Sequence, residues 1–385
     1  MKTFRASAVS TTLLCSALCA HTANAEITLL ERDNGTHYLN NLEVTAGGSV
    51  RVGFSNQMGS IDDGARAHRG TDDGTRFRFN VNYYLTDDWQ LLGRYEVGSD
   101  IFNTLGWKHH QIPGKDNTTR RKLYFGVANP TYGTFTFGKQ DSVFYNVVGK
   151  PTDKWVMDMK GQGPGNGIDN GDHDGSYRAR DIFLYTNTFG PVQLYTSANF
   201  ADSDYYTGAF TYRRKGGAAL GAIYAIEPDL KVGAAYSYNK ADLRKDGDPD
   251  KSTWDQQSLG TSISWAPGNW YLAGMIGYYK DFIPADRAGG VSSAALNPNQ
   301  YFRGNAHGWE GYAGYTIPVA GGWVTGIQPY IAESALRFQR YSETLNYVGM
   351  NIAFAYGFSI SLEHQFSNTS DHQPDISKAR LRYDF

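Results

Sequence analysis

The sequence predicts an all-β protein, a sixteen-stranded antiparallel up-and-down β-barrel that spans a membrane. The composition favours strands and turns, with 44 Gly, 27 Tyr and 20 Phe among 385 residues. Apolar and polar residues alternate along one segment after another, as they do in strands with one apolar and one polar face. Short and long connections also alternate, which is typical of a barrel with turns at one rim and loops at the other.

Residues 1–25 are predicted to be a secretory signal peptide. Lys2 and Arg5 precede an apolar run over residues 6–20, and a small-x-small cleavage site ends at Ala25. A membrane anchor is the alternative, but the run is short for a membrane-spanning helix. Both cysteines lie in this segment, so the mature chain is expected to have no disulfide, no thiolate metal site and no Cys nucleophile.

Charge and motifs argue against several other classes. Without Lys2 and Arg5 of the signal peptide, 34 basic residues stand against 38 acidic ones, a formal charge of −4 that gives no support to nucleic-acid binding. The stretch NGDHDG has calcium-loop spacing, with Asp181 at the position of the last ligand, but no helices flank it. GQGPGNG lacks the Lys and Ser/Thr of a phosphate-binding loop. We therefore expect no metal, no cofactor and no enzymatic activity.

The alternation of apolar and polar residues defines the strands. From Asn41 to Phe54 seven apolar or small residues alternate with seven polar or small ones, and residues 76–83 and 358–366 repeat the pattern. Sixteen such segments are predicted within residues 26–385: 40–56, 75–85, 89–98, 119–128, 132–140, 177–188, 191–201, 208–226, 230–241, 254–266, 269–281, 304–317, 323–338, 341–354, 357–367 and 376–385.

The connections decide between a sandwich and a barrel. Every second connection is short, as at residues 86–88 and 129–131, whereas the longest, residues 141–176, is polar and rich in Gly and Asp. A closed ring pairs every backbone group, so only alternate side chains need to be apolar in lipid. Several Trp residues fall near strand ends, as expected for interfacial girdles; packing in a sandwich core is the alternative. They are Trp89, Trp265, Trp270, Trp309 and Trp323.

The last predicted strand ends the chain with KARLRYDF. Leu381, Tyr383 and Phe385 are expected to face lipid, while Arg380 and Arg382 face water. We expect this strand to close the ring against residues 40–56. Its terminal aromatic residue resembles the signal by which outer-membrane barrels are recognised for insertion.

Two stretches of the sequence resemble a known family. YGTFTFGKQDSVFYNVVGKPTDKWVMDMKG is followed further along the chain by YRARDIFLYTNTFGP. The Gly-Thr-x-x-x-Gly-Lys strand, the Tyr-rich loop start and the Arg-x-Arg-Asp strand resemble, in this order, the general porin family of Gram-negative outer membranes. The resemblance extends over essentially the whole mature chain. It implies that residues 141–176 form a constriction loop folded into the lumen, with carboxylates facing basic residues on the opposite wall.

The resemblance also implies the basic side of this constriction. Arg78, Lys122 and Arg178 match the basic positions, and the alternation on their own strands places Arg76, Arg78 and Arg94 on the polar face. Solvation of the lumen wall is the alternative role for any single one of these side chains. The full expected basic set is Arg76, Arg78, Arg94, Lys122, Lys139, Arg178 and Arg180.

On the acidic side, Asp153 matches best and Asp158 is the nearest carboxylate to the second position. Met157 stands where that second acid is expected, and the Pro-Glu-Phe-Gly-Gly turn of the family is absent. Opposed charges across a narrow constriction orient water and disfavour apolar solutes, because these lose hydration without compensation. Rings of charge also bias ion selectivity.

Aromatic side chains on the predicted inner faces could bind solutes or could only line the wall. Such side chains stack on sugar rings in sugar-selective porins, whereas the alternative is that they line a polar wall with amphipathic bulk. The candidates for solute stacking are Trp155, Tyr124, Tyr195, Tyr271 and Tyr279.

A barrel of sixteen strands leaves an aqueous lumen, so the expected function is a channel for passive diffusion of small hydrophilic solutes and ions. An oligosaccharide-selective porin is the first alternative, and a surface receptor or adhesin with a plugged pore is the second. The expected surroundings are the lipid bilayer and lipopolysaccharide of the outer membrane. The resemblance further implies a homotrimer.

Overall fold

The computed structural model confirms the predicted barrel. It describes residues 26–33, 35, 39–57, 70–107, 117–157, 161–162, 171–206, 210–245, 251–281, 305–338, 341–370 and 372–385; the predicted signal peptide and Asp158 lie outside these residues. The long strands are β2 (Leu42–Gln57), β4 (Arg76–Tyr84), β5 (Gln90–Ser99), β6 (Thr118–Asn129), β7 (Gly133–Asp141), β8 (Arg178–Phe189), β9 (Val192–Asn199), β11 (Phe210–Ala225), β12 (Leu230–Lys245), β13 (Lys251–Trp265), β14 (Trp270–Lys280), β15 (Ala306–Tyr315), β17 (Val324–Phe338), β18 (Tyr341–Phe354), β19 (Phe358–Thr369) and β20 (Ile376–Asp384).

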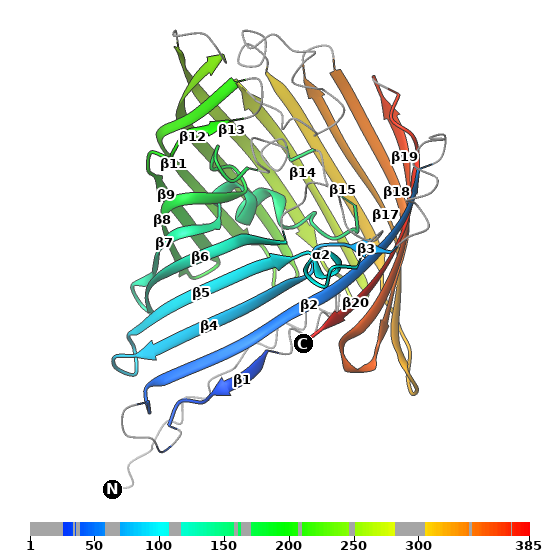
Figure 1. Ribbon diagram of the computed structural model, residues 1–385, viewed down its shortest axis with the longest axis horizontal. Helices are drawn as coiled ribbons and strands as arrows, with labels where there is room; N and C mark the ends of the chain where they lie inside the picture. The colour runs from blue at the N-terminus through cyan, green and yellow to red at the C-terminus, as the bar shows by residue number, and fades with distance from the viewer. Residues whose placement is uncertain are drawn as a thin grey trace, which may run out of the picture.

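Each long strand pairs antiparallel with its sequence neighbours, and β20 pairs with β2 to close the ring (Figure 1). Arg51 lies opposite Arg382, and Val52 lies opposite Leu381. At the end of this seam the Gly48 N–H donates to the Phe385 carbonyl at 2.7 Å. Closure therefore follows the register expected for an apolar outer face and a polar inner face.

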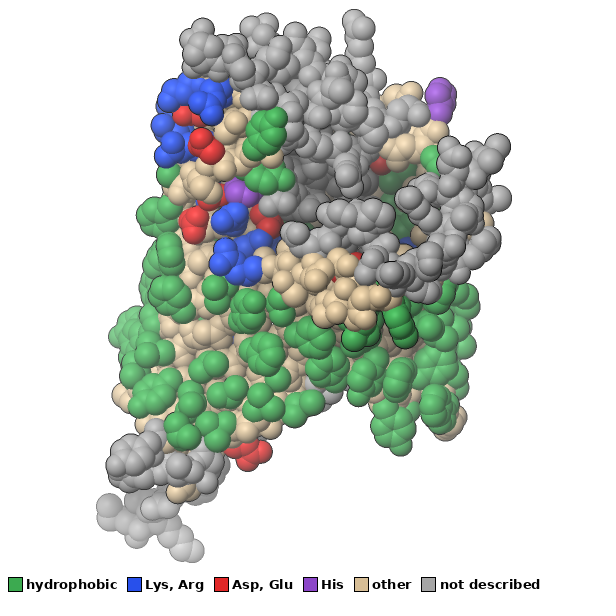
Figure 2. Space-filling model, viewed as in Figure 1, with side chains coloured by type: hydrophobic (Ala, Val, Ile, Leu, Met, Phe, Trp, Pro, Cys, Tyr) green, Lys and Arg blue, Asp and Glu red, His purple; other side chains and the backbone are tan. Residues whose placement is uncertain are grey.

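The outer face carries the apolar half of each strand. Leu220, Leu259, Ile276 and Ile331 are all more than half exposed, at 53–63%. In a protein dissolved in water such a surface would promote aggregation, but in a bilayer it faces the acyl chains. On the face in view, Figure 2 shows hydrophobic side chains as a band over the lower part of the barrel. The expected girdle residues Trp265, Trp270 and Trp323 are exposed as well.

Four short strands were not predicted. They are β1 (Ile27–Leu30), β3 (Thr71–Asp72), β10 (Tyr205–Tyr206) and β16 (Ile317–Pro318). β1 pairs with β2 at Val44–Ala46, just beyond the stretch of β2 that β20 covers. The partner of β2 is thus a composite of both chain ends, and a four-residue segment without a full period-two pattern gives no signal for such a pairing.

The described helices are short. They include α2 (Ile101–Thr104), the π-helix η1 (Tyr145–Gly149) and the 3-10 turn η4 (Ala355–Gly357). No helix in the described part of the chain is long and apolar enough to cross a membrane. Of these elements, η1 bears on the lumen, because it belongs to the connection between β7 and β8.

Deleting Phe385 should lower the yield of folded barrel. The deletion removes two backbone hydrogen bonds to Gly48 and a ring that lies 6.0 Å from Phe77, together about 2–4 kcal/mol of closure energy. The measurement is the fraction of heat-modifiable, folded protein on a gel after refolding into lipid. As a control, Phe125→Ala removes a lipid-facing ring that is 65% exposed. Equal folded yields for the two variants would contradict the closing role of Phe385.

Candidate functional site: a loop folded across the lumen

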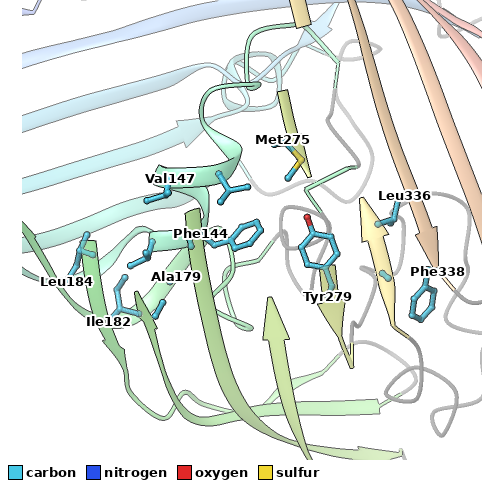
Figure 3. Close-up of a cluster of buried hydrophobic side chains, with 14 residues drawn as sticks. Phe144, Val147, Ala179, Ile182, Leu184, Met275, Tyr279, Leu336 and Phe338 are labelled. Carbon is cyan, nitrogen blue, oxygen red and sulfur yellow. The ribbon is translucent and has the colours of Figure 1, made fainter. Parts of the chain in front are cut away.

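The connection between β7 and β8 turns into the barrel. At its base the Ser142 N–H donates to the Tyr177 carbonyl at 2.7 Å, and the Ser142 hydroxyl donates to the Ser176 carbonyl at 2.6 Å. Beyond this base η1 presents Val147 and Val148, which are fully buried. Figure 3 shows Val147 and Phe144 of this loop among apolar side chains of the strands. The predicted constriction loop is therefore a packed structural element of the lumen.

Glycines on the inner wall make room for the loop. A Cβ at Gly260 of β13 would lie 2.8 Å from Cζ of Phe144, and one at Gly233 of β12 would lie 2.8 Å from the Val147 carbonyl oxygen. At Gly221 of β11 a Cβ would lie 3.0 Å from Val147. Each of these glycines lets the loop approach the backbone of its strand. Between them the Ser262 hydroxyl donates to the Val147 carbonyl at 2.6 Å.

Buried carboxylates hold the rest of the loop. Glu310 of β15 is 3% exposed and accepts hydrogen bonds from the Thr152 hydroxyl at 2.5 Å and the Gln162 N–H at 3.0 Å. Glu363 of β19 accepts from the backbone N–H groups of Val156 and Met157 at 2.9 and 2.8 Å. Carboxylates buried in this way satisfy loop N–H groups that would otherwise be orphaned. The loop thus contacts the inner wall from β11 to β19.

The wall formed by β2, β4, β5 and β20 carries a row of basic side chains. Arg76 and Arg78 of β4 lie opposite Ser49 and Gly47 of β2, on the same face as Arg51. Arg94 of β5 donates to the carbonyl groups of Val81 and Gly93 at 3.1 and 2.9 Å.

A β-bulge adds a residue that the alternation did not predict. The register between β5 and β6 shifts at Glu96, so that Arg121 is the extra residue. Arg121 Nε then lies 2.6 Å from Glu96 Oε1, while Lys122 Nζ lies 2.6 Å from Asp141 Oδ2. The side chains of two consecutive basic residues, Arg121 and Lys122, therefore lie on the lumen side, which strict period-two alternation cannot predict.

The members of the row on β2 and β20 were also not predicted as site residues. Arg51, Arg380 and Arg382 all stand on the polar face of their strands. Arg380 donates to the Val156 carbonyl of the loop at 2.8 Å, which places this part of the wall level with the loop. The sequence could have placed these residues on the polar face of their strands. Their position near the arginines of β4 follows only from closure of the ring.

On the loop itself Asp153 accepts a hydrogen bond from the Tyr145 hydroxyl. Burial raises the pKa of Tyr145 well above its ordinary value, and the nearby Asp153 charge raises it further, so the hydroxyl remains a donor. Tyr177 stacks edge-on to Tyr145 at 4.4 Å. Asp153 is thus held in place by an aromatic pair at the base of the loop.

Three of the predicted basic residues take part in a second charged cluster. Lys139 lies opposite Leu123, which is 46% exposed on the outer face, so the prediction that Lys139 extends the lumen row is wrong. Strict alternation itself places Lys139 there, because Phe137, two residues earlier on β7, is 37% exposed on the outer face. Lys139 instead pairs with Asp172, whose Oδ1 lies 3.7 Å from Arg178 Nε.

Arg180 belongs to the same cluster. Its Nη1 lies 2.9 Å from His173 Nε2, and its Nε lies 3.9 Å from Asp202 Oδ2. Burial opposes ionisation of Asp202, but hydrogen bonds from His173 and the Ser203 N–H still hold the pKa of Asp202 well below its ordinary value. The cluster therefore pairs its cations with Asp172 and Asp202 and ties the return of the loop to β7 and β8.

The aromatic candidates divide into two groups. Trp155 is 6% exposed between Tyr312 and Tyr347, and Tyr279 is 1% exposed beneath the loop, with its hydroxyl donating to the Gly161 carbonyl at 2.8 Å. Neither ring has a face open to a solute, so the stacking role predicted for these two is wrong. Trp155 is on the loop and packs against the wall, and the loop covers Tyr279; sequence periodicity reveals neither contact.

The other three aromatic candidates are less buried than Trp155 and Tyr279. Tyr271 donates to the Pro151 carbonyl at 2.8 Å and has Lys154 Nζ 5.0 Å above its ring. Tyr195 packs against the apolar cluster beneath the loop, and Tyr124 is half-buried. For Tyr124, Tyr195 and Tyr271 solute stacking stays a prediction.

This arrangement is a polar passage narrowed by a loop, with Arg380 of the wall in contact with the loop backbone. Within the described residues no group of three or more His, Cys, Asp or Glu side chains is arranged to hold a metal ion. The architecture defines a class of protein, a transmembrane barrel with a constricted lumen.

Comparison with known sequences identifies the family. A model of the family described as Gram-negative porin matches residues 10–297, well over half of the chain. The chain belongs to this family, and its barrel is a barrel of the outer membrane. Outer membrane protein F of Serratia marcescens is 25% identical over 232 residues, which cover 58% of this chain and 58% of that protein. The chain thus spans less than two thirds of that relative in the alignment.

Solved structures share the fold. OmpF of Salmonella typhi, in complex with daunomycin, has a TM-score of 0.66 at 13% identity and covers 90% of this chain and 98% of its own. The outer membrane channel DcaP of Acinetobacter baumannii has a TM-score of 0.63 at 13% identity, with 90% and 98% covered. OmpT of Vibrio cholerae in its trimer form has a TM-score of 0.59 at 14% identity, with 89% and 99% covered.

Replacing Gly260 with Val should loosen the loop from the wall. The new side chain would enter the space of Phe144 and cost about 1–3 kcal/mol by overpacking. Hydrogen exchange of the amides of residues 143–148 should then become at least about fivefold faster. Gly93→Val is the matched control, because a Cβ at Gly93 meets nothing within 4 Å. Unchanged exchange in the Gly260 variant would show that loop packing does not depend on the absence of a side chain at this position.

Proposed function

We propose that the protein forms a water-filled channel through which small hydrophilic solutes and ions diffuse across the outer membrane. The observation that carries this proposal is a closed ring of sixteen long strands with a loop packed against one part of the inner wall and a basic row on the rest. Sixteen strands enclose more space than their own side chains fill. Membership of the Gram-negative porin family supports the same activity.

The charges predict the direction of ion preference. Among described lumen residues level with the loop, Lys and Arg side chains outnumber the carboxylates that pair with them, because Arg51 and Arg76 have no acidic partner within 4.0 Å. A narrow polar passage of net positive charge raises the local concentration of anions. We propose a channel with a preference for small anions over cations.

The wider setting is also a proposal. The protein sits in the bilayer through its apolar band, and lipopolysaccharide surrounds its outer end. A homotrimer is supported by the trimer form of Vibrio cholerae OmpT among the solved structures of this fold. Glutaraldehyde cross-linking of detergent-purified protein tests the oligomer.

Conductance in planar bilayers tests the channel itself. Purified protein should produce discrete, ohmic current steps in KCl, because the lumen conducts without a moving gate. A folded barrel that produces no steps would refute the proposal and would favour a plugged receptor or adhesin.

Neutralising the basic row should shift ion selectivity toward cations. For Arg78→Gln combined with Lys122→Gln, the anion-to-cation permeability ratio should fall by about fivefold, the equivalent of about 1 kcal/mol of Coulomb interaction. The measurement is the reversal potential in a KCl gradient. Lys139→Gln combined with Arg180→Gln removes the same charge from the second cluster and should leave the ratio nearly unchanged. Equal shifts in both double variants would contradict the assignment of the row to the constriction.

A further inference from the structure

A hollow lies on the outer face of the seam that closes the ring. It spans β18, β19, β20 and β2, which are consecutive around the barrel (Figure 1), and it has a volume of about 670 Å³. Pockets that hold small ligands have volumes of about 300–1,000 Å³. From each of the four strands two outward residues and the residue between them line the hollow. The outward side chains form two rows that cross the strands.

The lower row is apolar. Met350 of β18 lies opposite Leu362 of β19, and Ala379 of β20 lies between Leu362 and Phe54 of β2. The surface is hollow over β20 because the short Ala379 side chain stands between two larger ones. Leu362 and Phe54 are 44% and 38% exposed, and Leu381, two residues further along β20, is 46% exposed. The lower row is therefore continuous with the apolar surface that contacts acyl chains.

The upper row is mainly polar. His364 Nδ1 lies 2.8 Å from the hydroxyl oxygen of Ser377, and Ser377 lies opposite Asn56 of β2. Asn56 is followed by Gln57, the last residue of β2, so the row lies near the end of the paired strands. At such a position the hydrocarbon of the bilayer gives way to its polar boundary. We call the space over the two rows the seam hollow.

The polar row has hydrogen-bonding capacity that the protein leaves unused. Within the described part of the chain the Asn56 side chain makes no hydrogen bond, and the His364 ring is bonded only through Nδ1. Polar groups next to hydrocarbon are costly unless a partner satisfies them. A ligand that offers a donor or an acceptor at this level would therefore be stabilised.

The residues of the row indicate the chemistry of that partner. Of the described outward residues that line the seam hollow none is Lys or Arg, whereas Lys378 stands on the inner face of β20 and pairs with Asp73. A phosphate group calls for Lys or Arg. Imidazole, hydroxyl and amide groups instead suit an uncharged polar group such as a hydroxyl or an amide.

We propose that the seam hollow binds the acyl chain of a membrane lipid that carries an uncharged hydroxyl or amide group near its polar end. The chain lies on Met350, Leu362 and Ala379, and the polar group bonds to His364 and Asn56. A lipid is the occupant because the lower row continues a surface that is already in contact with acyl chains and the polar row lies at its margin. The site does not depend on conduction through the lumen.

The methyl group of Met350 provides a direct readout of the site. Detergent-purified barrel with ¹³C-labelled Met methyl groups is titrated with methyl 3-hydroxymyristate or with methyl myristate, two uncharged esters that differ by one hydroxyl. The Met350 resonance should shift saturably with both esters. Half-saturation should need about fivefold less of the hydroxylated ester, as expected for one net hydrogen bond. Met275, which is 3% exposed beneath the loop, is the internal reference, and Met350→Leu assigns the resonance.

Matched variants test the two rows separately. Ala379→Phe fills the lower row and should abolish the saturable shift for both esters. Ala234→Phe places the same ring at an exposed alanine of β12 and should leave the shift intact. His364→Leu and Asn56→Leu should each remove most of the preference for the hydroxylated ester while methyl myristate still binds. Asn368→Leu, at an exposed position of β19 outside the seam hollow, should retain the preference.

Two results would overturn the proposal. The first is a Met350 resonance that responds to neither ester, or responds equally in Ala379→Phe and in the wild type. The second is a loss of cross-linked oligomer in Ala379→Phe but not in Ala234→Phe, together with no ester response, which would show that a second copy of the chain covers the seam hollow. Heat-modifiable mobility on a gel confirms that each variant is folded, and His364→Leu keeps the test decisive if Ala379→Phe does not fold.

Discussion

Backbone groups inside a bilayer have no water to bond with, so a sheet can remain there only if it has no free edge. In this protein the last edge is removed between β2 and β20, and β1 and Phe385 complete the partner of β2. Once the ring is closed, every strand has one face toward lipid and one toward the lumen. The apolar band, the polar wall and the meeting of residues from both chain ends all follow from this closure.

A ring of sixteen strands also leaves a space that the protein fills only in part. The loop after β7 uses small residues where its apolar side chains meet the wall, as at Gly260, and buried carboxylates where its backbone needs acceptors, as at Glu310. Both the glycines and the carboxylates lie on strands that are far from the loop in sequence. The narrowing of the lumen is therefore a property of the whole ring, since wall and loop are complementary in shape and hydrogen bonding.

Charge in the lumen is then set by which side chains find partners. A bulge decides one case, because it makes Arg121 an extra residue that pairs with Glu96 at the lumen. Gly53 decides another, because a Cβ there would lie 3.0 Å from Cβ of Asp73, whose carboxylate pairs with Arg380 and Lys378 of β20. The electrostatic character of the passage thus depends on local details, a bulge and a glycine, that change the partner of a charge without changing the fold.

Sequence alone determined the barrel, because period-two alternation and the order of short and long connections are local properties that closure leaves intact. It also placed Arg76, Arg78 and Arg94 on the polar face, since each lies in a regular strand. Only the tertiary structure decided that Trp155 and Tyr279 are buried, because the loop packs Trp155 against Tyr312 and Tyr347 of the wall and covers Tyr279. It likewise decided that Arg51 lies between Arg76 and Arg382, since the two ends of the chain become neighbours only when the ring closes.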